Sequence, residues 1–196
     1  MDDPNRHIWQ KFHIHKGDTL PFVGFKDYTR DELAILFNEL GYKTGAEIGV
    51  KRGWFSNLLC ESIPDLKLLC VDPWTKYSRS VGDERAEQHY KVAAKVLSPY
   101  NATLMRMTSM EAVKEIPNDS LDFVYIDGLH DFDSVILDLI HWTPKVRIGG
   151  IVSGHDYIHH FEGGVIQAVN AYTYAHNIHS WYITKGEPLP SFYWVR

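Results

Sequence analysis

The sequence predicts a three-layer α/β protein built on a mainly parallel sheet of seven strands, with an antiparallel strand pair near the end of the chain. Two observations carry this prediction. From residue 44 onward, short apolar runs alternate with segments of helical periodicity, which is the pattern of successive βαβ units. The last two apolar runs are separated only by residues 185–190, which contain one glycine and two prolines, so these strands should pair antiparallel.

The N-terminal part of the chain divides at residue 28. Residues 1–28 lack a steady periodicity and are interpreted as an N-terminal arm with little regular structure, or as a lid. Residues 29–196 are expected to form a single domain. Its first element is a helix, because Thr29 and Glu32 have the spacing of a capping box and apolar side chains follow at helical intervals up to Leu40. Gly41 is expected to end this helix.

The remaining chain is assigned to alternating strands and helices by the same criteria. Strands are predicted over residues 46–50, 67–71, 102–107, 121–126, 149–156, 180–184 and 192–195. Helices are predicted over residues 54–63, 83–97, 109–116, 135–142 and 165–175. Residues 75–82 form a polar insertion after a strand, which places them above the carboxyl edge of the sheet, where ligands bind in such folds.

The composition narrows the class of protein. The chain has 196 residues and a formal net charge of -5, which argues against a nucleic-acid partner, since such partners bind clustered Lys and Arg. No apolar run approaches the ~20 residues of a membrane span, and no signal peptide is visible, so no membrane partner is expected. Cys60 and Cys70 are too few for a disulfide framework, so a reducing, cytoplasmic location is expected.

The loop after the first parallel strand contains Gly49 and Gly53 but does not match the G-x-G-x-x-G pattern. Lys51 and Arg52 replace the inner glycine that lets the backbone approach a pyrophosphate, which counts against a nicotinamide dinucleotide. Glu47 lies at the end of an otherwise apolar strand and needs a compensating partner. The ammonium group of a ligand is one such partner.

Asp72 closes the next strand, 25 residues after Glu47. A carboxylate at this place can accept hydrogen bonds from ribose hydroxyls. Alternatively, Asp72 caps the turn that precedes Pro73. Taken alone, the two interpretations have equal weight, and the presence of Glu47 and Gly49 favours ligand binding.

Three segments together resemble a known family. They are residues 46–56 (AEIGVKRGWFS), 71–74 (VDPW) and 126–132 (IDGLHDF). This ordered set is similar to the class I S-adenosylmethionine (SAM)-dependent methyltransferases, and more narrowly to the small stand-alone subgroup whose strand ends read VDPW and IDGxHxY. The resemblance covers about residues 44–157. It implies the Rossmann-like methyltransferase fold, with SAM as the cofactor.

The resemblance also implies cofactor contacts at successive strand ends, for Glu47, Gly49, Asp72, Trp74, Ser109 and Asp127. Glu47 and Gly49 would sit at the methionine end of SAM, and Asp72 would hold the ribose hydroxyls. Ser109 would lie near the adenine rim. Trp74 would flank the adenine, with packing beneath the polar insertion as the alternative.

The candidate catalytic residues are Asp127, His130 and His155, at two neighbouring strand ends. A hydroxyl acceptor must lose a proton during methyl transfer, and a histidine or carboxylate within reach can accept it. His130 is the first candidate for this general base, and His155 is the second. The alternative for His130 is a helix-starting histidine that bonds a backbone carbonyl.

A divalent cation is the other means of lowering the pKa of an acceptor hydroxyl. Metal-dependent O-methyltransferases of this fold place carboxylates or amides at three points around these two strand ends. Asp127 and Asp156 match two of them, whereas Tyr157 stands where Asn or Asp would be expected. Weak binding of Mg²⁺ by the two carboxylates is therefore a further expectation. His159 and His160 lack the spacing of a transition-metal site and are interpreted as exposed loop residues.

The sequence thus predicts a SAM-dependent methyltransferase whose acceptor is a small molecule, with a hydroxyl as the group that is methylated. No Asn/Asp-Pro-Pro-Tyr/Phe segment follows residue 126, which favours oxygen over an amino acceptor. Two alternatives remain: a non-catalytic protein that binds SAM or another nucleoside, and a nicotinamide-dependent Rossmann oxidoreductase.

The N-terminal arm and the polar insertion supply further candidates. The candidate lid residues are Trp9, Phe12, His13, His15, Tyr77 and Arg79, with ordinary surface packing as the favoured alternative for each one alone. The aromatic residues of the arm also suggest a homodimer contact.

Overall fold

The computed structural model describes residues 3–15, 21–23, 28–75, 82–159 and 163–196. This part of the chain forms one eight-stranded sheet with the order β1-β7-β8-β6-β5-β2-β3-β4. The strands are β1 (Phe22–Val23), β2 (Thr44–Ile48), β3 (Lys67–Val71), β4 (Ala102–Met105), β5 (Leu121–Ile126), β6 (Val146–Gly154), β7 (Trp181–Ile183) and β8 (Phe192–Val195). The helices are α1 (Pro4–Lys11), α2 (Arg30–Glu39), α3 (Trp54–Ser62), α4 (Asp83–Leu97), α5 (Ser109–Ala112), α6 (Phe132–Trp142), the 3₁₀ turn η1 (Thr143–Lys145) and α7 (Val165–Ala175).

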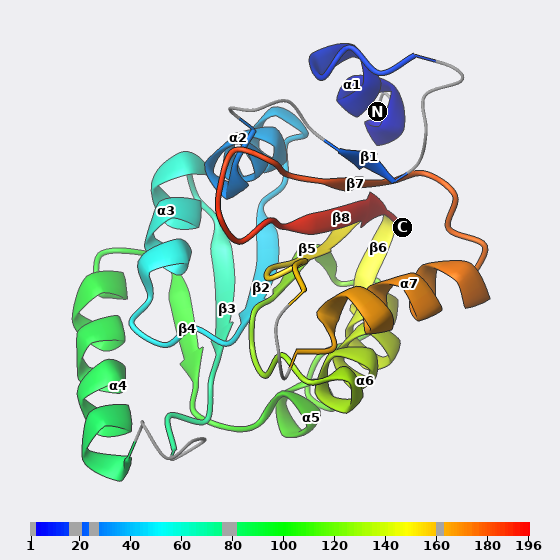
Figure 1. Ribbon diagram of the computed structural model, residues 1–196. Coiled ribbons are helices and arrows are strands. Elements are labelled where there is room, and N and C mark those ends of the chain that lie inside the picture. The colour runs from blue at the N-terminus through cyan, green and yellow to red at the C-terminus, as the bar shows by residue number, and fades with distance from the viewer. Residues whose placement is uncertain (1–2, 16–20, 24–27, 76–81, 160–162) are drawn as a thin grey trace.

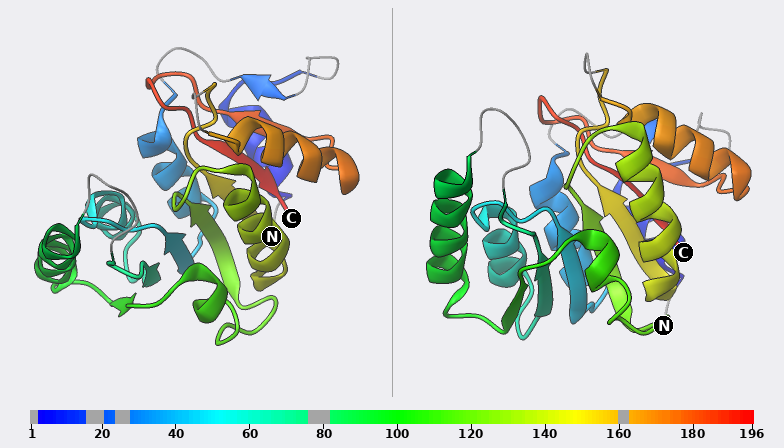
Figure 2. Two further views of the ribbon diagram at one scale, coloured as in Figure 1. Left: turned by 60° about the horizontal axis from the view of Figure 1, so that its bottom comes forward. Right: turned by 90° about the horizontal axis from the view of Figure 1, so that it is seen from below.

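Helices cover both faces of the sheet: α2, α3 and α4 lie on one face, and α5, α6 and α7 lie on the other (Figures 1 and 2). Successive strand residues point to opposite faces, so Phe123 and Tyr125 join the core beneath α2 and α3. Val124 and Ile126 join the second core, beneath α6 and α7. Among the described residues, no helix is both long and apolar enough to span a membrane.

The predicted fold class is confirmed, and the antiparallel pair is β7 and β8. β8 lies between β6 and β7 and is antiparallel to both, whereas the other strand pairs are parallel. β1 is an addition that the sequence did not predict, and it pairs parallel with β7 at the edge of the sheet. With β1, the sheet therefore has eight strands and not the seven that the sequence predicted.

Several predicted boundaries shift by a few residues. β4 ends at Met105 and α5 at Ala112, both earlier than predicted, while β6 starts earlier, at Val146. α6 also starts earlier, at Phe132, because the Asp131 side chain accepts a hydrogen bond from the Ser134 amide (2.9 Å) and caps the helix.

The N-terminal arm is more ordered than the sequence indicated. Residues Pro4–Lys11 form α1 because the Asp3 side chain accepts a hydrogen bond from the Asn5 amide (3.0 Å) and a proline occupies the first turn. The Trp9 indole donates to the Tyr182 hydroxyl (2.8 Å), which attaches α1 to β7. The interpretation of residues 1–28 as an arm with little regular structure is therefore wrong for α1 and β1.

α2 forms as predicted, with a different cap. The Thr29 hydroxyl oxygen accepts a hydrogen bond from the Asp31 amide (3.2 Å), and the same hydroxyl donates to the Glu32 carboxylate (3.0 Å). Glu32 thus binds the Thr29 hydroxyl in place of the backbone amide that a capping box uses. Gly41 follows the helix with a φ of +72°, which favours glycine and ends the element.

Asp122 fastens three strands together at the edge of the sheet where β2, β5 and β6 begin. Its carboxylate accepts hydrogen bonds from the amides of Lys43 (2.7 Å) and Thr44 (2.8 Å), and from the Arg147 guanidinium (2.7 Å). Burial alone would raise the pKa of Asp122, but these bonds lower it below its usual value. The carboxylate form therefore stabilises the fold.

We predict that Asp122→Asn lowers the free energy of unfolding by about 2–4 kcal/mol at pH 7, because an amide nitrogen would face donors that need an acceptor. The contribution of Asp122 is present above about pH 4 and is lost as the pH falls through its lowered pKa. Urea denaturation at pH 7 and at pH 3 measures both effects. Asp119→Asn, at an exposed site, is the matched control and should cost less than about 1 kcal/mol. Equal costs for the two variants would contradict this role.

Candidate active site

Four site residues directly follow four neighbouring strands, and one backbone pattern holds them in a row. Each donates its N–H to the carbonyl oxygen of the last residue of the adjacent strand: Gly49 to Val71 (2.8 Å), Asp72 to Met105 (3.2 Å), Asp127 to Ile48 (2.7 Å) and His155 to Ile126 (3.0 Å). The parallel ladder thus continues one residue past the strands. It fixes these four residues at the carboxyl edge of the sheet, where such folds bind ligands.

Gly49 is the point at which the loops after β2 and β5 meet. Its φ is +91°, and a Cβ atom at this position would lie 2.1 Å from the Asp127 carbonyl oxygen. Only glycine fits this close approach, because any side chain would push the two loops apart.

A cavity of about 770 Å³ opens at this edge. It is lined by most of the predicted site residues, namely Glu47, Gly49, Asp72, Ser109, Asp127, His130, His155 and Asp156. Further lining residues that the sequence did not single out include Arg30, Trp54, Phe55, Asp138 and Leu189. Glu47 and Asp72 therefore face one shared space.

Glu47 is a buried acid at the end of β2, with only 2% of its surface exposed. The Ser56 hydroxyl of α3 donates a hydrogen bond to its carboxylate. Burial raises the pKa of Glu47 to about 8, so this group is mostly protonated at pH 7. No ion pair with Glu47 occurs within the described ranges, so a cationic ligand group would complete its surroundings.

Asp72 accepts hydrogen bonds from two loop amides and also lines the cavity. One of its oxygens accepts the Lys51 amide (2.8 Å), and the other accepts the Trp74 amide (2.7 Å). Each oxygen keeps a second lone pair, so the turn-capping and ligand-binding interpretations of Asp72 are compatible.

Trp74 does not line the cavity among the described residues. Its side chain is 3% exposed, its indole donates to the Lys51 carbonyl (2.8 Å), and its ring meets the Tyr90 ring edge-on at 5.1 Å. This position corresponds to the packing alternative, so the geometry gives no support to Trp74 as a side chain that flanks adenine.

Ser109 lines the cavity and belongs to a network that the sequence did not reveal. Its hydroxyl donates to the carboxylate of Asp138 on α6, and it accepts a hydrogen bond from the Trp142 indole (2.7 Å). Asp138 is 5% exposed, and burial raises its pKa to about 6. Nothing in the local pattern marks Asp138, because an acid in an amphipathic helix usually faces solvent.

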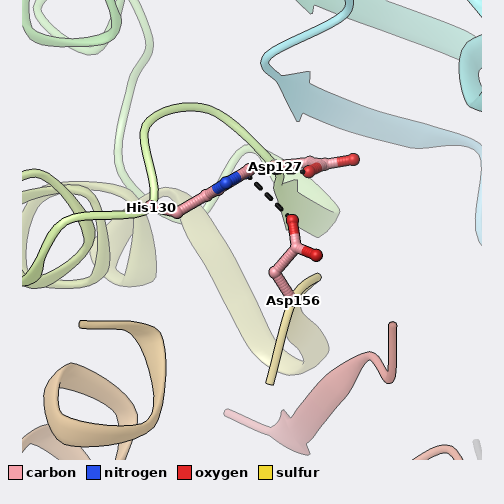
Figure 3. A group of neighbouring side chains, drawn as sticks. All are labelled: Asp127, His130 and Asp156. Carbon is pink, nitrogen blue, oxygen red and sulfur yellow. Dashed lines mark ion pairs between the residues drawn. The ribbon is translucent and has the colours of Figure 1, made fainter. Parts of the chain in front are cut away.

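Two histidines and two carboxylates gather where the loops after β5 and β6 meet. Figure 3 shows three of them, Asp127, His130 and Asp156. The His130 Nε2 atom lies 3.0 Å from Asp156 and 3.5 Å from Asp127. The His155 Nδ1 atom lies 3.7 Å from Asp127 and 3.6 Å from Asp156. The sequence predicted that these residues lie at two neighbouring strand ends, and the structure brings all four within 3.7 Å of a partner in the cluster.

The charges in this cluster stabilise one another. Asp127 chiefly, together with Asp156, raises the pKa of His130 above its usual value despite burial. Burial alone would lower the pKa of His155, but the same two carboxylates raise it to about 9. Burial alone would raise the pKa of Asp127, and the two histidines outweigh it and lower that pKa. In this cluster the two carboxylates thus make both imidazoles more basic, and the imidazoles make Asp127 more acidic.

The same cluster contains the candidate metal ligands. Asp127, His130 and Asp156 each offer one ligand atom, and these atoms lie within 4.8 Å of one another. Tyr157 does not join them, because its hydroxyl donates to Asn170 of α7 (2.9 Å). The third group beside the two carboxylates is thus His130, a residue that the sequence assigned to proton transfer.

Arg30 lines the cavity together with His155, Glu187 is a partner of Arg30, and sequence reasoning missed both Arg30 and Glu187. The Arg30 amide donates to Glu187 (2.9 Å), and the Arg30 guanidinium lies over the Phe55 ring at 5.4 Å. The buried Nε2 atom of His155 has no hydrogen-bond partner in the described part of the chain, and Glu187 lies 4.0 Å away. These residues come from distant parts of the sequence, so no local motif signals them.

The N-terminal candidates for a lid lie elsewhere. None of the described residues 3–15 lines the cavity, and α1 lies beside β7 at the edge of the sheet (Figure 1). The expectation that Trp9, Phe12, His13 and His15 cover the cavity therefore has no support from this arrangement. His159 is exposed, as predicted, while Tyr77, Arg79 and His160 lie outside the described residues.

Comparison with known proteins identifies the domain. Residues 46–157 match a family model described as a methyltransferase domain. The uncharacterized protein y4gI of Sinorhizobium fredii (strain NBRC 101917 / NGR234) is 30% identical over 120 residues. This match covers 56% of the chain but only 12% of y4gI, so the chain spans a small part of that relative.

Solved structures share the fold at low sequence identity. The O-methyltransferase from Bacillus cereus in complex with SAH has a TM-score of 0.64 and 13% identity, covering 100% of this chain and 92% of that one. The O-methyltransferase NovP has a TM-score of 0.61 and 19% identity, over 85% of this chain and 79% of NovP. Cofactor-bound Rv0187 from MTB has a TM-score of 0.62 and 15% identity, over 85% and 78% of the two chains.

At these identities the structural likeness shows the fold alone, whereas the family model spans more than half of the chain. The chain therefore belongs to the methyltransferase-domain family and has the class I SAM-dependent methyltransferase fold that its strand-end motifs resemble.

Proposed function

We propose that this protein is a SAM-dependent O-methyltransferase that methylates a hydroxyl group of a small-molecule acceptor. One observation carries the proposal: acids suited to the ammonium and ribose groups of SAM share a single cavity with a histidine–carboxylate cluster. Family membership supplies the reaction class. The arrangement of the cavity supports the assignment of donor and acceptor ends.

SAM would lie across the carboxyl ends of β2 and β3. Glu47 would accept the ammonium group of the methionine part, which supplies the cation that its buried carboxyl lacks. Asp72 would accept the ribose hydroxyls with its remaining lone pairs. The adenine would then extend toward Ser109.

The methyl group would face Asp127 and His130 at the other side of the cavity. When bound, SAM would supply a methyl group on a sulfonium and would be released as S-adenosylhomocysteine (SAH), and the cavity wall at Asp127 and His130 would hold the acceptor oxygen in line with that methyl group. The hydroxyl proton passes to the Nε2 atom of neutral His130. Asp127 and Asp156 then stabilise the imidazolium, because both lie within 3.5 Å of Nε2.

Two observations favour oxygen as the acceptor atom. Two structurally similar proteins, one from Bacillus cereus and the protein NovP, are named O-methyltransferases. A general base beside the methyl position suits a hydroxyl, which must lose its proton to become a good nucleophile. The apolar Phe55 and Leu189, together with Arg30, would contact the rest of the acceptor.

A second mechanism uses a divalent cation at Asp127, His130 and Asp156. When bound, the cation would lower the pKa of the acceptor hydroxyl. One imidazole nitrogen and two carboxylates suit manganese, iron or zinc better than magnesium, which prefers oxygen ligands. In this case His130 is a ligand and the base is His155 or water.

The alternatives predict different behaviour. A nicotinamide enzyme would need room for a pyrophosphate at Lys51, where this loop carries a side chain at a φ of +55°. A non-catalytic binder would bind SAM without turnover.

We also propose a cytoplasmic location, because Cys60 and Cys70 are both buried free thiols. A homodimer remains a proposal.

We predict that Glu47→Gln weakens SAH binding by about 10–100-fold, since the ammonium loses a charged acceptor. In the wild type at pH 7, binding should release close to one proton, because the carboxyl with its pKa of about 8 must ionise. Titration calorimetry in phosphate and in Tris measures both. Glu61→Gln, at an exposed site on the neighbouring helix α3, is the control. Unchanged affinity and no proton release would contradict the cofactor assignment.

We predict that His130→Gln lowers kcat by about 10²–10⁴-fold while SAH affinity changes less than about twofold. SAH release against a panel of catechols, phenols and sugars measures turnover. His141→Gln, at an exposed site near the end of α6, should leave turnover unchanged. Loss of wild-type turnover with a chelator, and its recovery with Mn²⁺, would favour the cation mechanism. Full turnover in His130→Gln would exclude His130 as the base.

A further inference from the structure

Exposed apolar side chains gather around the mouth of the cavity. Among the described residues, nine large hydrophobic side chains are exposed, and four of them line this cavity. These four are Trp54, Leu129, Leu137 and Leu189, with 66%, 51%, 43% and 41% of their surface exposed. Leucine and tryptophan are mostly buried in folded proteins, and exposed apolar side chains that gather at a ligand cavity mark a binding surface. The proposed chemistry does not explain them.

Three of these side chains, Trp54, Leu129 and Leu189, form what we call the apolar rim. Leu189 lies in the loop between β7 and β8, Leu129 follows β5, and Trp54 follows the loop after β2. The strands β8, β6, β5 and β2 are consecutive neighbours in the sheet, so the rim surrounds this part of the cavity mouth. SAM is assigned to the ends of β2 and β3, and the rim therefore borders the acceptor end.

Two rim residues lie directly beside the proposed proton-transfer centre. Leu129 immediately precedes His130 in the chain. Leu189 precedes Pro190, whose carbonyl oxygen accepts a hydrogen bond from the amide of Tyr157, in the loop after β6 (2.9 Å). A molecule that places a hydroxyl group at His130 would therefore meet the rim with the part that extends out of the cavity.

Trp54 is an exposed aromatic side chain without a partner. Within the described ranges its indole donates no hydrogen bond and its ring stacks on no other ring. Trp74 and Trp142, by contrast, are buried, and the indole of each donates a hydrogen bond. The indole of Trp54 thus offers a flat apolar face at the cavity mouth, which suits a planar or apolar ligand.

The size and charge of this region favour the acceptor itself as the molecule that covers the rim. Three side chains are too few for a protein partner, because a stable interface takes about 20–30 residues from each side. An anionic group would need an unpaired cation, whereas Arg30 already has Glu187 at 3.8 Å from its Nε atom. A neutral, apolar part of a small molecule needs neither.

We infer that the acceptor carries its hydroxyl group on an extended apolar body, as an alkylated phenol does, and that Trp54, Leu129 and Leu189 bind this body at the cavity mouth. This inference rests on the proposed function and specifies its substrate class. The hydroxyl end enters the cavity toward His130, and the apolar body covers the rim. Free sugars and other small polar alcohols would leave the rim in contact with water, so they would gain no affinity from it.

The test uses titration calorimetry of phenol, 4-propylphenol and 4-hexylphenol with protein that is saturated with SAH. For the wild type, the affinity should rise at least about tenfold from phenol to 4-hexylphenol, because the alkyl chain covers apolar surface. Trp54→Ala should reduce this gain to less than about threefold. Tyr174→Ala, which removes an 88% exposed aromatic side chain on α7 outside the cavity, is the matched control and should keep the full gain.

The outcomes separate this inference from the proposed function. Absence of 4-hexylphenol binding, equal affinity for the three phenols, or an unchanged gain in Trp54→Ala overturns the inference and leaves the proposed function intact. A fall of more than about tenfold in the SAH affinity of Trp54→Ala also overturns it, because the indole would then contact the donor. Failure of the wild type to bind SAH overturns the proposed function as well. If Trp54→Ala does not fold, Leu129→Ser replaces it, and a full gain in that variant overturns the inference.

Discussion

Hydrogen bonds that continue the parallel ladder one residue beyond the strands determine where chemistry can take place in this protein. Gly49, Asp72, Asp127 and His155 each bond to the last residue of a neighbouring strand, so their positions are as rigid as the sheet itself. The close contact of Gly49 with the Asp127 carbonyl draws the two central loops together. Because backbone bonds set this spacing, the side chains are free to face the cavity.

The charges in the cavity are balanced in two different ways. Around Asp127 and Asp156, His130 and His155 lie within 3.7 Å of the carboxylates, which therefore have partners without a ligand. Around Glu47, burial outweighs the charge of Arg30, and the carboxyl group remains mostly protonated at pH 7. The carboxylates at the Asp127 end of the cavity thus have partners within the protein. The carboxyl group of Glu47 at the other end is buried and has a place for a cationic group of a ligand. This asymmetry agrees with a cationic donor at the Glu47 end and a proton-transfer centre at the other.

Local patterns predicted the fold well because its signals are local. The strand Lys67–Val71 and the helices Asp83–Leu97 and Val165–Ala175 have the bounds that periodicity indicated. The helix Pro4–Lys11 was missed because it is short and mostly polar, and only one of its side chains, Ile8, is buried.

The site was only partly predictable, for a related reason. Residues directly after strands, such as Asp72 and Asp127, could be identified because topology alone brings strand ends together. Arg30, Asp138 and Glu187 could not, since their places depend on how separate elements pack. For Trp74 the motif left two interpretations, and the geometry corresponds to packing, because the indole donates to the Lys51 carbonyl.

The hydrogen bond between the Arg30 amide and Glu187 joins two segments that lie 157 residues apart. Under the proposed function, the donor half of the cavity is built from one continuous stretch of chain, and Arg30, which Glu187 holds, lines the acceptor half from outside that stretch. A few substitutions in these two peripheral segments could therefore retune which molecules are modified, while the inherited machinery for handling the methyl donor stays untouched. Such a division would allow related proteins to differ in the acceptor that they bind while they keep the same residues for binding the methyl donor.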